Sequence, residues 1–560
     1  MTVKHGLRNG MGLLVLLAAC SSGTATTRRD SGAGGTGGGR DGASDGQPRD
    51  GASSTGGTVT DGRTAMGDFA AGEAGRSVGF GGSITGGSGV GGTGVGGVDG
   101  GGSGVDGSGL DGSGVDGIGS GGTTALVDAG ADVVNIDGSA VDAPAVDVPV
   151  LPDAGVDVAV AEDGVVMRNT CVAPASAALA NAGLPAGFCA WTWASGLGNP
   201  RGIMRNANGD LLVVEQTAGR ITLLYDDDGN GVSNTGERVV LATTSGLNHG
   251  IAMSGGYLYA SSDSTVYRWP YTGGRQPLGA AQTVVSGLPT GGHSTRTLLF
   301  DGQGRLYVAI GSGSNVDGDS SRAKIIRYAA SALAGGATYD QGEVFAEGMR
   351  NEVGLTLDAQ GRVWGVENGV DDLNRADLGG DIHNDNPGEE LNLFAMPGRF
   401  YGYPYCWSEF LLPTGVGKGP GTQWLHPQFN GDGIHSDAWC QNTANVVAPV
   451  LSMQAHSAPL DIKFYSGGAF PAAMNGDAII SFHGSWDRTA ATGYKVVRVP
   501  FGESGMPTGD PVPLLEYSGG GDTGSGWPHR PVGIETGVDG RLFVSSDASG
   551  IIIAIGYNGG

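Results

Sequence analysis

The side chains best suited to chemistry are basic and imidazole groups that recur at equivalent places in the second half of the sequence. At least one precedes each of six repeated units: Arg201, His249, His293, Arg350 with Asn351, His456, and His529 with Arg530. The chain has only 9 His and a formal net charge of −25, so chance is a poor explanation for this arrangement. Cationic donors gathered in a water-poor funnel bind anions. The pattern therefore predicts an anion-binding site.

The repeated unit must position these side chains. It consists of an apolar strand, a turn built on glycine and a second strand rich in β-branched and aromatic residues. The turn glycines are successively 47, 48, 57, 115 and 64 residues apart: Gly209, Gly256, Gly304, Gly361, Gly476 and Gly540. Spacings of about 40–50 residues are typical of four-stranded blades around a central channel. The sequence therefore predicts an all-β fold, a six-bladed β-propeller, with the basic residues at one channel mouth.

Two alternatives to this fold remain open. The 115-residue spacing leaves room for a seventh blade. We expect a long insertion there instead, because residues 371–450 contain few strand-like runs and many Pro, Asn and Gly. A β-sandwich with similar turns is the other alternative, and six matching units count against it.

Composition divides the chain into two parts. Glycine provides 110 of the 560 residues and is concentrated in the first third, together with Ser and Asp. Such a segment buries too little apolar surface to offset its backbone entropy. We expect residues 21–170 to be a disordered tether and residues 171–560 to form the propeller. The excess of 56 acidic over 31 basic residues argues against binding to nucleic acid.

The N-terminus has the features of an export signal. Lys4 and Arg8 precede an apolar run over residues 13–19, which ends at Cys20. The sequence Leu-Ala-Ala-Cys over residues 17–20 is typical of a bacterial lipoprotein signal, cleaved before the lipid-bearing cysteine. We therefore expect residues 1–20 to be a signal and Cys20 to anchor the chain to the cell envelope. Ser21 favours the outer membrane, and no other membrane attachment is expected. The alternative is an ordinary cleaved signal peptide.

Four cysteines remain once Cys20 is assigned to the anchor. An exported chain meets an oxidising compartment in which disulfides persist. We expect two bridges between cysteines close in sequence, Cys171–Cys189 and Cys406–Cys440.

Several segments around the basic residues have a specific order of residue types: Gly292-His293-Ser-Thr-Arg, Met349-Arg350-Asn351-Glu, Glu367-Asn-Gly-Val-Asp, Glu389-Glu-Leu-Asn392, Gly402-Tyr-Pro404 and Trp527-Pro-His-Arg530. Together they resemble the soluble quinoprotein glucose and sorbosone dehydrogenases, especially the pyranose dehydrogenase branch. The resemblance covers residues 190–557. It implies a propeller that binds pyrroloquinoline quinone (PQQ), a flat tricarboxylate, with Ca²⁺. Such a protein oxidises a hydroxyl of a sugar or polyol and passes electrons to an external acceptor, a quinone or a cytochrome.

The resemblance also implies roles for single residues. His293 corresponds to the general base that takes the sugar's hydroxyl proton, a role suited to an imidazole with a pKa near working pH. Arg350 and Asn351 correspond to the pair at the quinone oxygens, where Arg350 stabilises the charge of reduction. The carbonyls of Gly369 and Val370 correspond to those that hold calcium.

The remaining predicted cofactor-binding residues are Arg201, His249, His456, His483 and Arg530. Arg530 corresponds to a carboxylate-binding arginine. The three histidines stand where the glucose dehydrogenases have Gln, Thr and Lys, so the identity of the sugar is left open.

A second metal signal lies within one loop. Oxygen donors occupy positions 1, 3, 5, 7, 9 and 12 of a calcium-loop pattern: Asp226, Asp228, Asn230, Val232, Asn234 and Glu237. Gly231 permits the sharp turn. Strands rather than helices are predicted on both sides, so we expect a structural calcium site. The alternative is a solvated acidic hairpin.

Two other functions remain open on the sequence. A gluconolactonase-like propeller would use calcium held by acidic side chains such as Glu215, Asp263 and Glu367 to hydrolyse lactones. The basic channel mouth counts against it. The second is a tethered propeller that binds glycans or a partner without catalysis.

Overall fold

The computed structural model describes residues 158–160, 166–519 and 527–559. The predicted signal, Cys20 and most of the predicted tether lie outside these residues. In the part of the chain that is described, no helix has the length and apolar character needed to cross a membrane.

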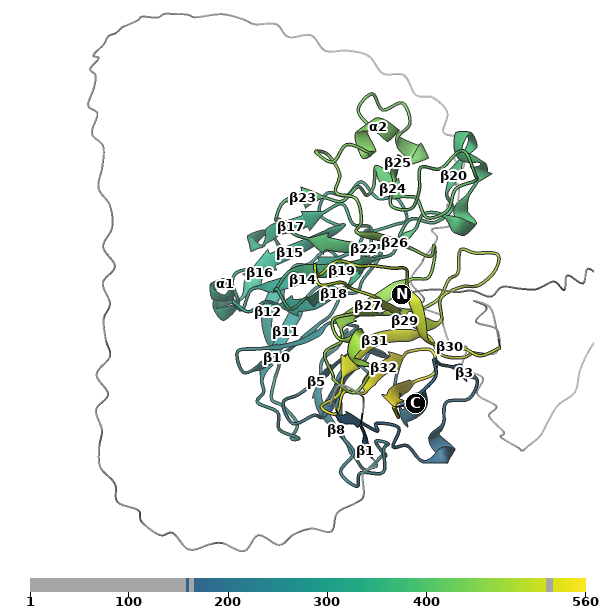
Figure 1. Ribbon diagram of the computed structural model, residues 1–560. Coiled ribbons are helices and arrows are strands. Elements are labelled where there is room, and N and C mark those ends of the chain that lie inside the picture. Colours follow the sequence, from purple (N-terminus) through teal and green to yellow (C-terminus); the bar gives the residue numbers. More distant parts are fainter. Residues whose placement is uncertain (1–157, 161–165, 520–526, 560) are drawn as a thin grey trace, which may run out of the picture. The chain divides into compact units, whose positions relative to one another are not determined.

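Six antiparallel sheets of four strands form the blades of an all-β propeller (Figure 1). From the channel outward, the first three contain β5 (Pro200–Arg205), β6 (Leu211–Glu215), β7 (Arg220–Leu224) and β8 (Arg238–Thr243); β9 (Ile251–Ser254), β10 (Tyr257–Ser261), β11 (Val266–Pro270) and β12 (Gln282–Ser286); and β13 (Leu298–Phe300), β14 (Leu306–Ile310), β15 (Lys324–Tyr328) and β17 (Glu343–Glu347). The other three contain β18 (Glu352–Leu357), β19 (Val363–Glu367), β22 (Glu389–Phe394) and β26 (Leu451–Met453); β27 (Pro459–Phe464), β28 (Ala478–Phe482), β29 (Lys495–Val499) and β30 (Val512–Tyr517); and β31 (Pro531–Thr536), β32 (Leu542–Ser546), β33 (Ile551–Tyr557) and β4 (Phe188–Ala194). The predicted six-bladed propeller is confirmed.

Short elements supplement the blades. Three strands extend blade edges: β3 (Ala182–Gly183), β16 (Ala337–Thr338) and β23 (Arg399–Phe400). A separate pair precedes the propeller: β1 (Val158–Val160) and β2 (Val166–Arg168). The helices are α1 (Ala330–Gly335) and α2 (Asp437–Cys440), with 3₁₀ turns at Ala175–Ala177, Tyr339–Gln341, Ala376–Leu378, His383–Asp385, Pro427–Phe429 and Ala472–Met474.

The ring closes by pairing the two ends of the propeller. The innermost strands contact one another in chain order, and the last, β31, contacts the first, β5, as Figure 1 shows for the yellow and blue strands. The sixth blade takes its outer strand from the other end of the domain, because β4 pairs with β33. The Cys171–Cys189 disulfide links β4 to the segment before it, and Cys406–Cys440 bridges the insertion. Both predicted pairings are confirmed.

All six turn glycines have a positive φ, between 72° and 93°, which only glycine adopts without steric cost.

The irregular spacing of these glycines along the sequence has a simple cause. The long gap lies within the fourth blade. There β20 (Asn374–Arg375) and β21 (Gly380–Asp381) separate β19 from β22, and β24 (Cys406–Ser408), β25 (Gln423–Leu425) and α2 separate β22 from β26. The predicted insertion is confirmed, and the described residues form no seventh blade.

Small residues set the distance between neighbouring inner strands. A Cβ on Gly202 would overlap the carbonyl of His249, and one on Gly250 would overlap the carbonyl of Arg296. A serine on the second strand of several blades donates to the next inner strand: Ser261 Oγ to Arg296 O at 2.6 Å, Ser481 Oγ to Val532 O at 2.5 Å and Ser545 Oγ to Arg201 O at 2.6 Å. These contacts fix the starts of the inner strands, which carry most of the predicted ligand-binding residues.

Candidate active site at the channel mouth

One pocket collects predicted residues from the third to the sixth blade. His293 precedes β13 and Arg350 precedes β18, while His456 and Arg530 precede β27 and β31. The pocket is lined by these four residues with Gly369 and His483, and by Asn368, Asp371, Glu389, Ala458, Gly484, Ser485 and Trp486. Residues up to 237 positions apart in sequence therefore face one space (530 − 293).

The other predicted cofactor-binding residues lie behind this lining. Asp547 joins Arg201 to the pocket: its Oδ2 is 2.6 Å from Arg201 Nη1, and its Oδ1 is 2.9 Å from His483 Nε2. Asn351 reaches His293 through Gly311, where a Cβ would lie 2.5 Å from His293 Cβ and 2.6 Å from Asn351 Oδ1. Glycine at this position leaves the two side chains room to approach each other.

His293 has the hydrogen bonding of a neutral base. Its Nδ1 lies 3.1 Å from Ser312 O and 3.0 Å from Ser312 Oγ. Donation from Nδ1–H to the carbonyl assigns the lone pair to Nε2. Burial, followed by the nearby Arg350 charge, lowers the pKa of His293 to about 3. This is well below the near-neutral value assumed from sequence, so the ring is neutral throughout the ordinary pH range.

Arg350 is held rigidly by acceptors on two segments. Its Nη2 lies 2.6 Å from Asp371 Oδ2, and its Nε donates to Asn315 O at 3.1 Å. Its backbone N–H donates to Glu367 Oε1 at 2.5 Å. A guanidinium fixed before a ligand arrives needs little reorganisation when charge develops beside it.

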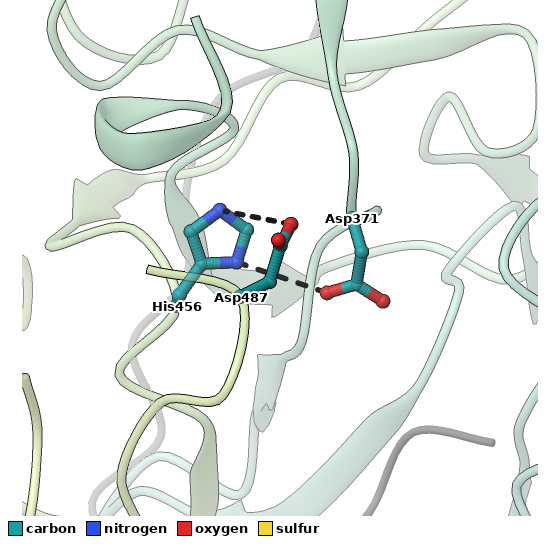
Figure 2. Close-up of side chains that lie close together, drawn as sticks. All are labelled: Asp371, His456 and Asp487. Atoms are coloured by element: carbon teal, nitrogen blue, oxygen red, sulfur yellow. Dashed lines mark ion pairs between the residues drawn. The ribbon is translucent and has the colours of Figure 1, made fainter. Parts of the chain in front are cut away.

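Buried carboxylates at the pocket were not predicted. Figure 2 shows His456 beside Asp371 and Asp487, with His456 Nδ1 3.8 Å from Asp371 Oδ1 and His456 Nε2 4.0 Å from Asp487 Oδ2. Together with Asp547, they make the mouth less positive than the basic residues alone suggested. One signal was present in the sequence, because Ser-Ser-Asp follows the second strand in both the second and the sixth blade, at residues 261–263 and 545–547.

Some buried polar atoms near the axis have no protein partner. Three such atoms make no hydrogen bond with any described residue: Arg201 Nε, Asn248 Oδ1 and His249 Nδ1. All three residues are at most 8% exposed. An unsatisfied buried polar atom costs about 1–3 kcal/mol. Burial, and then Arg201, lower the pKa of His249 to about 3, so this imidazole is neutral. These atoms are suited to contact a bound polar ligand.

The predicted calcium carbonyls follow a supported turn. Glu389 accepts the backbone N–H of Gly369 at 2.9 Å and that of Ala458 at 2.8 Å. No backbone N–H in the turns and loops of the described residues donates to the carbonyl of Gly369 or Val370. Both oxygens therefore remain available to a cation.

The acidic loop between β7 and β8 brings its carboxylates together as its sequence pattern predicts. Ligand oxygens of Asp226, Asp228 and Glu237 lie within 4.8 Å of one another. Gly231 has φ 83°, and its carbonyl accepts Trp191 Nε1–H from β4 at 2.7 Å. Calcium binding by this loop stays a prediction. A bound ion would stiffen the first blade, which contains β7 and β8 and lies next to the blade that closes the ring.

Removing calcium is expected to lower the melting temperature of the full chain, and Asp226→Asn should abolish the loop's share of this effect. A ligand at 100 times its Kd stabilises by about 2.7 kcal/mol, which corresponds to a few degrees in a domain of this size. Melting curves in chelator and in millimolar Ca²⁺ measure it, with the exposed Glu503→Gln as the matched control. Equal calcium shifts in Asp226→Asn and the control would contradict the prediction.

Three glutamates form a buried cluster in the fourth blade. Asn392 Nδ2 lies 3.3 Å from Glu352 Oε2, 3.5 Å from Glu367 Oε2 and 3.2 Å from Glu390 Oε2. Burial raises the pKa of all three, to about 7 for Glu390, and repulsion from the neighbouring glutamates adds to this for Glu352 and Glu367. Two of the three residues named for a lactonase are thus committed elsewhere: Glu367 to this cluster, and Glu215 to Arg220 at 2.8 Å.

Glu390 is expected to contribute a share of the free energy of unfolding of the chelator-treated protein that falls as pH rises from 5 to 8, opposite in sign to the shares of His249 and His293, whose pKa values are lowered. Burial raises the pKa of Glu390 to about 7, from 4.5 in the unfolded chain, so the folded state binds the proton more tightly and loses this advantage across that window. The loss is roughly 3 kcal/mol for one such group. Urea unfolding at each pH measures this share as the free energy of unfolding of the wild type minus that of Glu390→Gln, which should fall across the window. A difference that stays level or grows would refute the assignment.

The architecture and the pocket together define a six-bladed propeller with an enzyme-like cluster of basic and acidic groups at its channel mouth. The chain belongs to the TrAA12-like family, whose model matches residues 182–558. It is 36% identical over 394 residues to a pyrroloquinoline quinone-dependent sugar dehydrogenase of Hypocrea jecorina, covering 64% of this chain and 86% of that protein. It is 33% identical over 413 residues to a pyrroloquinoline quinone-dependent pyranose dehydrogenase of Coprinopsis cinerea, of which the chain spans only 52%.

Solved structures give the same relationship. The calcium structure of Trichoderma reesei Carbohydrate-Active Enzymes Family AA12 has a TM-score of 0.60 and 32% identity, with 69% of this chain and 99% of that chain covered. The holo form of the pyranose dehydrogenase PQQ domain from Coprinopsis cinerea has a TM-score of 0.58 and 31% identity, with coverage of 69% and 98%.

Proposed function

We propose that this chain is a PQQ-dependent dehydrogenase that oxidises a hydroxyl of a sugar or related polyol. The observation that carries the proposal is the neutral, half-buried His293 in one pocket with the immobilised Arg350. A base without charge and a fixed cation are the two groups that removal of a proton and a hydride from an alcohol requires. The names of the two relatives, one a sugar and one a pyranose dehydrogenase, support the same reaction class.

The donors around the pocket fit a flat tricarboxylate. Arg530 is anchored through Nη2 to Gly484 O at 2.8 Å and through Nε to His483 O at 3.1 Å, which orients its guanidinium at the pocket wall. Within the described chain, Arg201 Nε and His249 Nδ1 are also unpartnered, but neither residue lines this pocket. The free carbonyls of Gly369 and Val370 suit Ca²⁺, which prefers oxygen ligands and would offset the charge of the cofactor.

When bound, PQQ supplies a quinone carbon that accepts hydride. His293 Nε2 takes the hydroxyl proton of the sugar, and the Nδ1–H bond to Ser312 keeps the ring in the required tautomer. Arg350 would stabilise the negative charge that develops on reduction of the bound cofactor, and Asn351 would add a neutral donor beside it. His456 and His483 complete the wall against which the sugar lies.

Reconstitution tests the proposal. Chelator-treated protein is loaded with PQQ and Ca²⁺ and screened by dye reduction over aldoses and polyols. Turnover that needs PQQ is expected. Saturable PQQ binding without turnover on any sugar would favour a binding protein, and lactone hydrolysis with calcium alone would favour the hydrolase.

We further propose that the chain is exported and attached by lipid at Cys20, in the outer membrane, and that the electrons leave to an external quinone or cytochrome. The signal-like N-terminus supports the anchor. Cys20→Ala should release the protein from the membrane fraction, and continued attachment of this variant would contradict the anchor.

A further inference from the structure

His456 has the hydrogen bonding of a metal-ligating imidazole. Its Nε2 lies 2.6 Å from the carbonyl oxygen of His383, so Nε2–H donates to that carbonyl. Nδ1 is then left with its lone pair. Metal-bound histidines usually donate the other ring N–H to a carbonyl or carboxylate in this way, because it fixes the tautomer and the ring plane.

The lone pair of His456 points toward another acceptor. Its Nδ1 is 3.8 Å from Asp371 Oδ1. In this tautomer both atoms are hydrogen-bond acceptors, so no proton lies between them. A carboxylate oxygen of Asp487 completes a group whose ligand atoms lie within 4.8 Å of one another (Figure 2). The remaining bonds hold the acids in place, since Asp371 Oδ2 pairs with Arg350 and Asp487 Oδ2 accepts Asp372 N–H at 2.7 Å.

The charges around this group favour the binding of a cation. Asp371, His456 and Asp487 are all at most 9% exposed, and the buried Glu389 lies on the same pocket. Within the described part of the chain, Arg350 is the one guanidinium paired with these acids, since Arg488 pairs with Asp385 at 2.9 Å.

We propose that Asp371, His456 and Asp487 bind a divalent first-row transition-metal ion on the wall of the pocket. One imidazole nitrogen and two carboxylate oxygens favour such ions, whereas Ca²⁺ takes oxygen ligands alone. The ligand atoms need to close to roughly 3.3 Å for tetrahedral bonds of about 2.0–2.1 Å. Asp371 and His456 line the pocket, so a fourth position is open to water or a ligand oxygen. This site does not depend on the proposed quinone chemistry.

Cobalt provides a direct test with a readout other than activity. Chelator-treated full-length protein is titrated with Co²⁺ and followed by visible d–d absorption, with calorimetry for stoichiometry. We expect one ion per chain with a band of low-coordinate cobalt. His456→Asn and Asp487→Asn should each weaken binding at least 10-fold, while Asp226→Asn retains it.

His435→Asn is the matched control. This histidine also pairs with an aspartate, Asp432, at 2.5 Å, but it lies in the insertion outside the pocket. The cobalt band should survive this change. Asp487→Asn can still accept the Asp372 N–H, so it decides the question if circular dichroism shows that His456→Asn has unfolded.

Three outcomes would overturn the proposal. They are the absence of stoichiometric cobalt binding, a band unchanged in Asp487→Asn, and displacement of cobalt by millimolar Ca²⁺, which would indicate one shared calcium site at the neighbouring carbonyls. None of these results bears on PQQ-dependent turnover, which is measured separately.

Discussion

His293→Gln is expected to slow reduction of the bound cofactor by sugar by about 10²–10⁴-fold, the usual contribution of a positioned general base. Glutamine is similar in size and can still donate toward Ser312, but it cannot take a proton. Cofactor affinity should change little, because the base contacts the hydroxyl of the sugar. Anaerobic stopped-flow absorbance of the loaded enzyme measures the step, and spectroscopic titration measures cofactor binding.

The pH dependence sharpens this test. Burial and then Arg350 lower the pKa of His293 to about 3, so the free base persists far below its usual range. The rate of cofactor reduction should therefore show no acid limb near pH 6.5 in the wild type. His435→Gln, in the insertion outside the pocket, is the control and should match the wild type. A normal reduction rate in His293→Gln would remove its role as base.

The backbone features of the fold could be predicted because each has a local sequence cause. Gly209 and Gly540 mark the first and last blades, since a positive φ is required at the same turn in every repeat. The disulfides could be predicted because an even number of cysteines remained after Cys20 and the members of each pair lie close in sequence. The sheet edge that closes the ring could not be predicted, because no local pattern states that β4 pairs with β33, whose partners Cys189 and Gly556 are 367 residues apart in the chain (556 − 189).

The candidate site could be predicted only in part. Basic residues at equivalent places were visible, since they begin the inner strands. The acids were not: Asp371 and Asp487 come from an insertion in the fourth blade and a loop of the fifth, and neither belongs to the repeat. Their effect is large, because Asp371 fixes Arg350. The low pKa of His293 depends on burial and on Arg350, 57 residues away (350 − 293), so the sequence alone did not indicate it.

Arg350→Ala is expected to weaken cofactor binding and slow its reduction by about 10²–10³-fold, as for loss of one fixed donor at a site of developing charge. It also leaves Asp371 buried and unpaired, which typically costs about 3–5 kcal/mol. Arg350→Lys keeps the charge but cannot reach Asp371 and Asn315 together, so it should restore stability better than rate. Titration, stopped-flow absorbance and urea unfolding measure the three quantities.

A second substitution separates charge stabilisation from structural support. In Arg350→Ala with Asp371→Asn the unpaired charge is gone, so the free energy of unfolding should recover while the reduction rate stays low. Arg327→Ala, which breaks an ion pair with Glu343 on the outer blade face, controls for general loss of an arginine and should alter neither. If the double variant regains wild-type rates, Arg350 acts only by neutralising Asp371, and the proposed electrostatic role at the quinone oxygens is wrong.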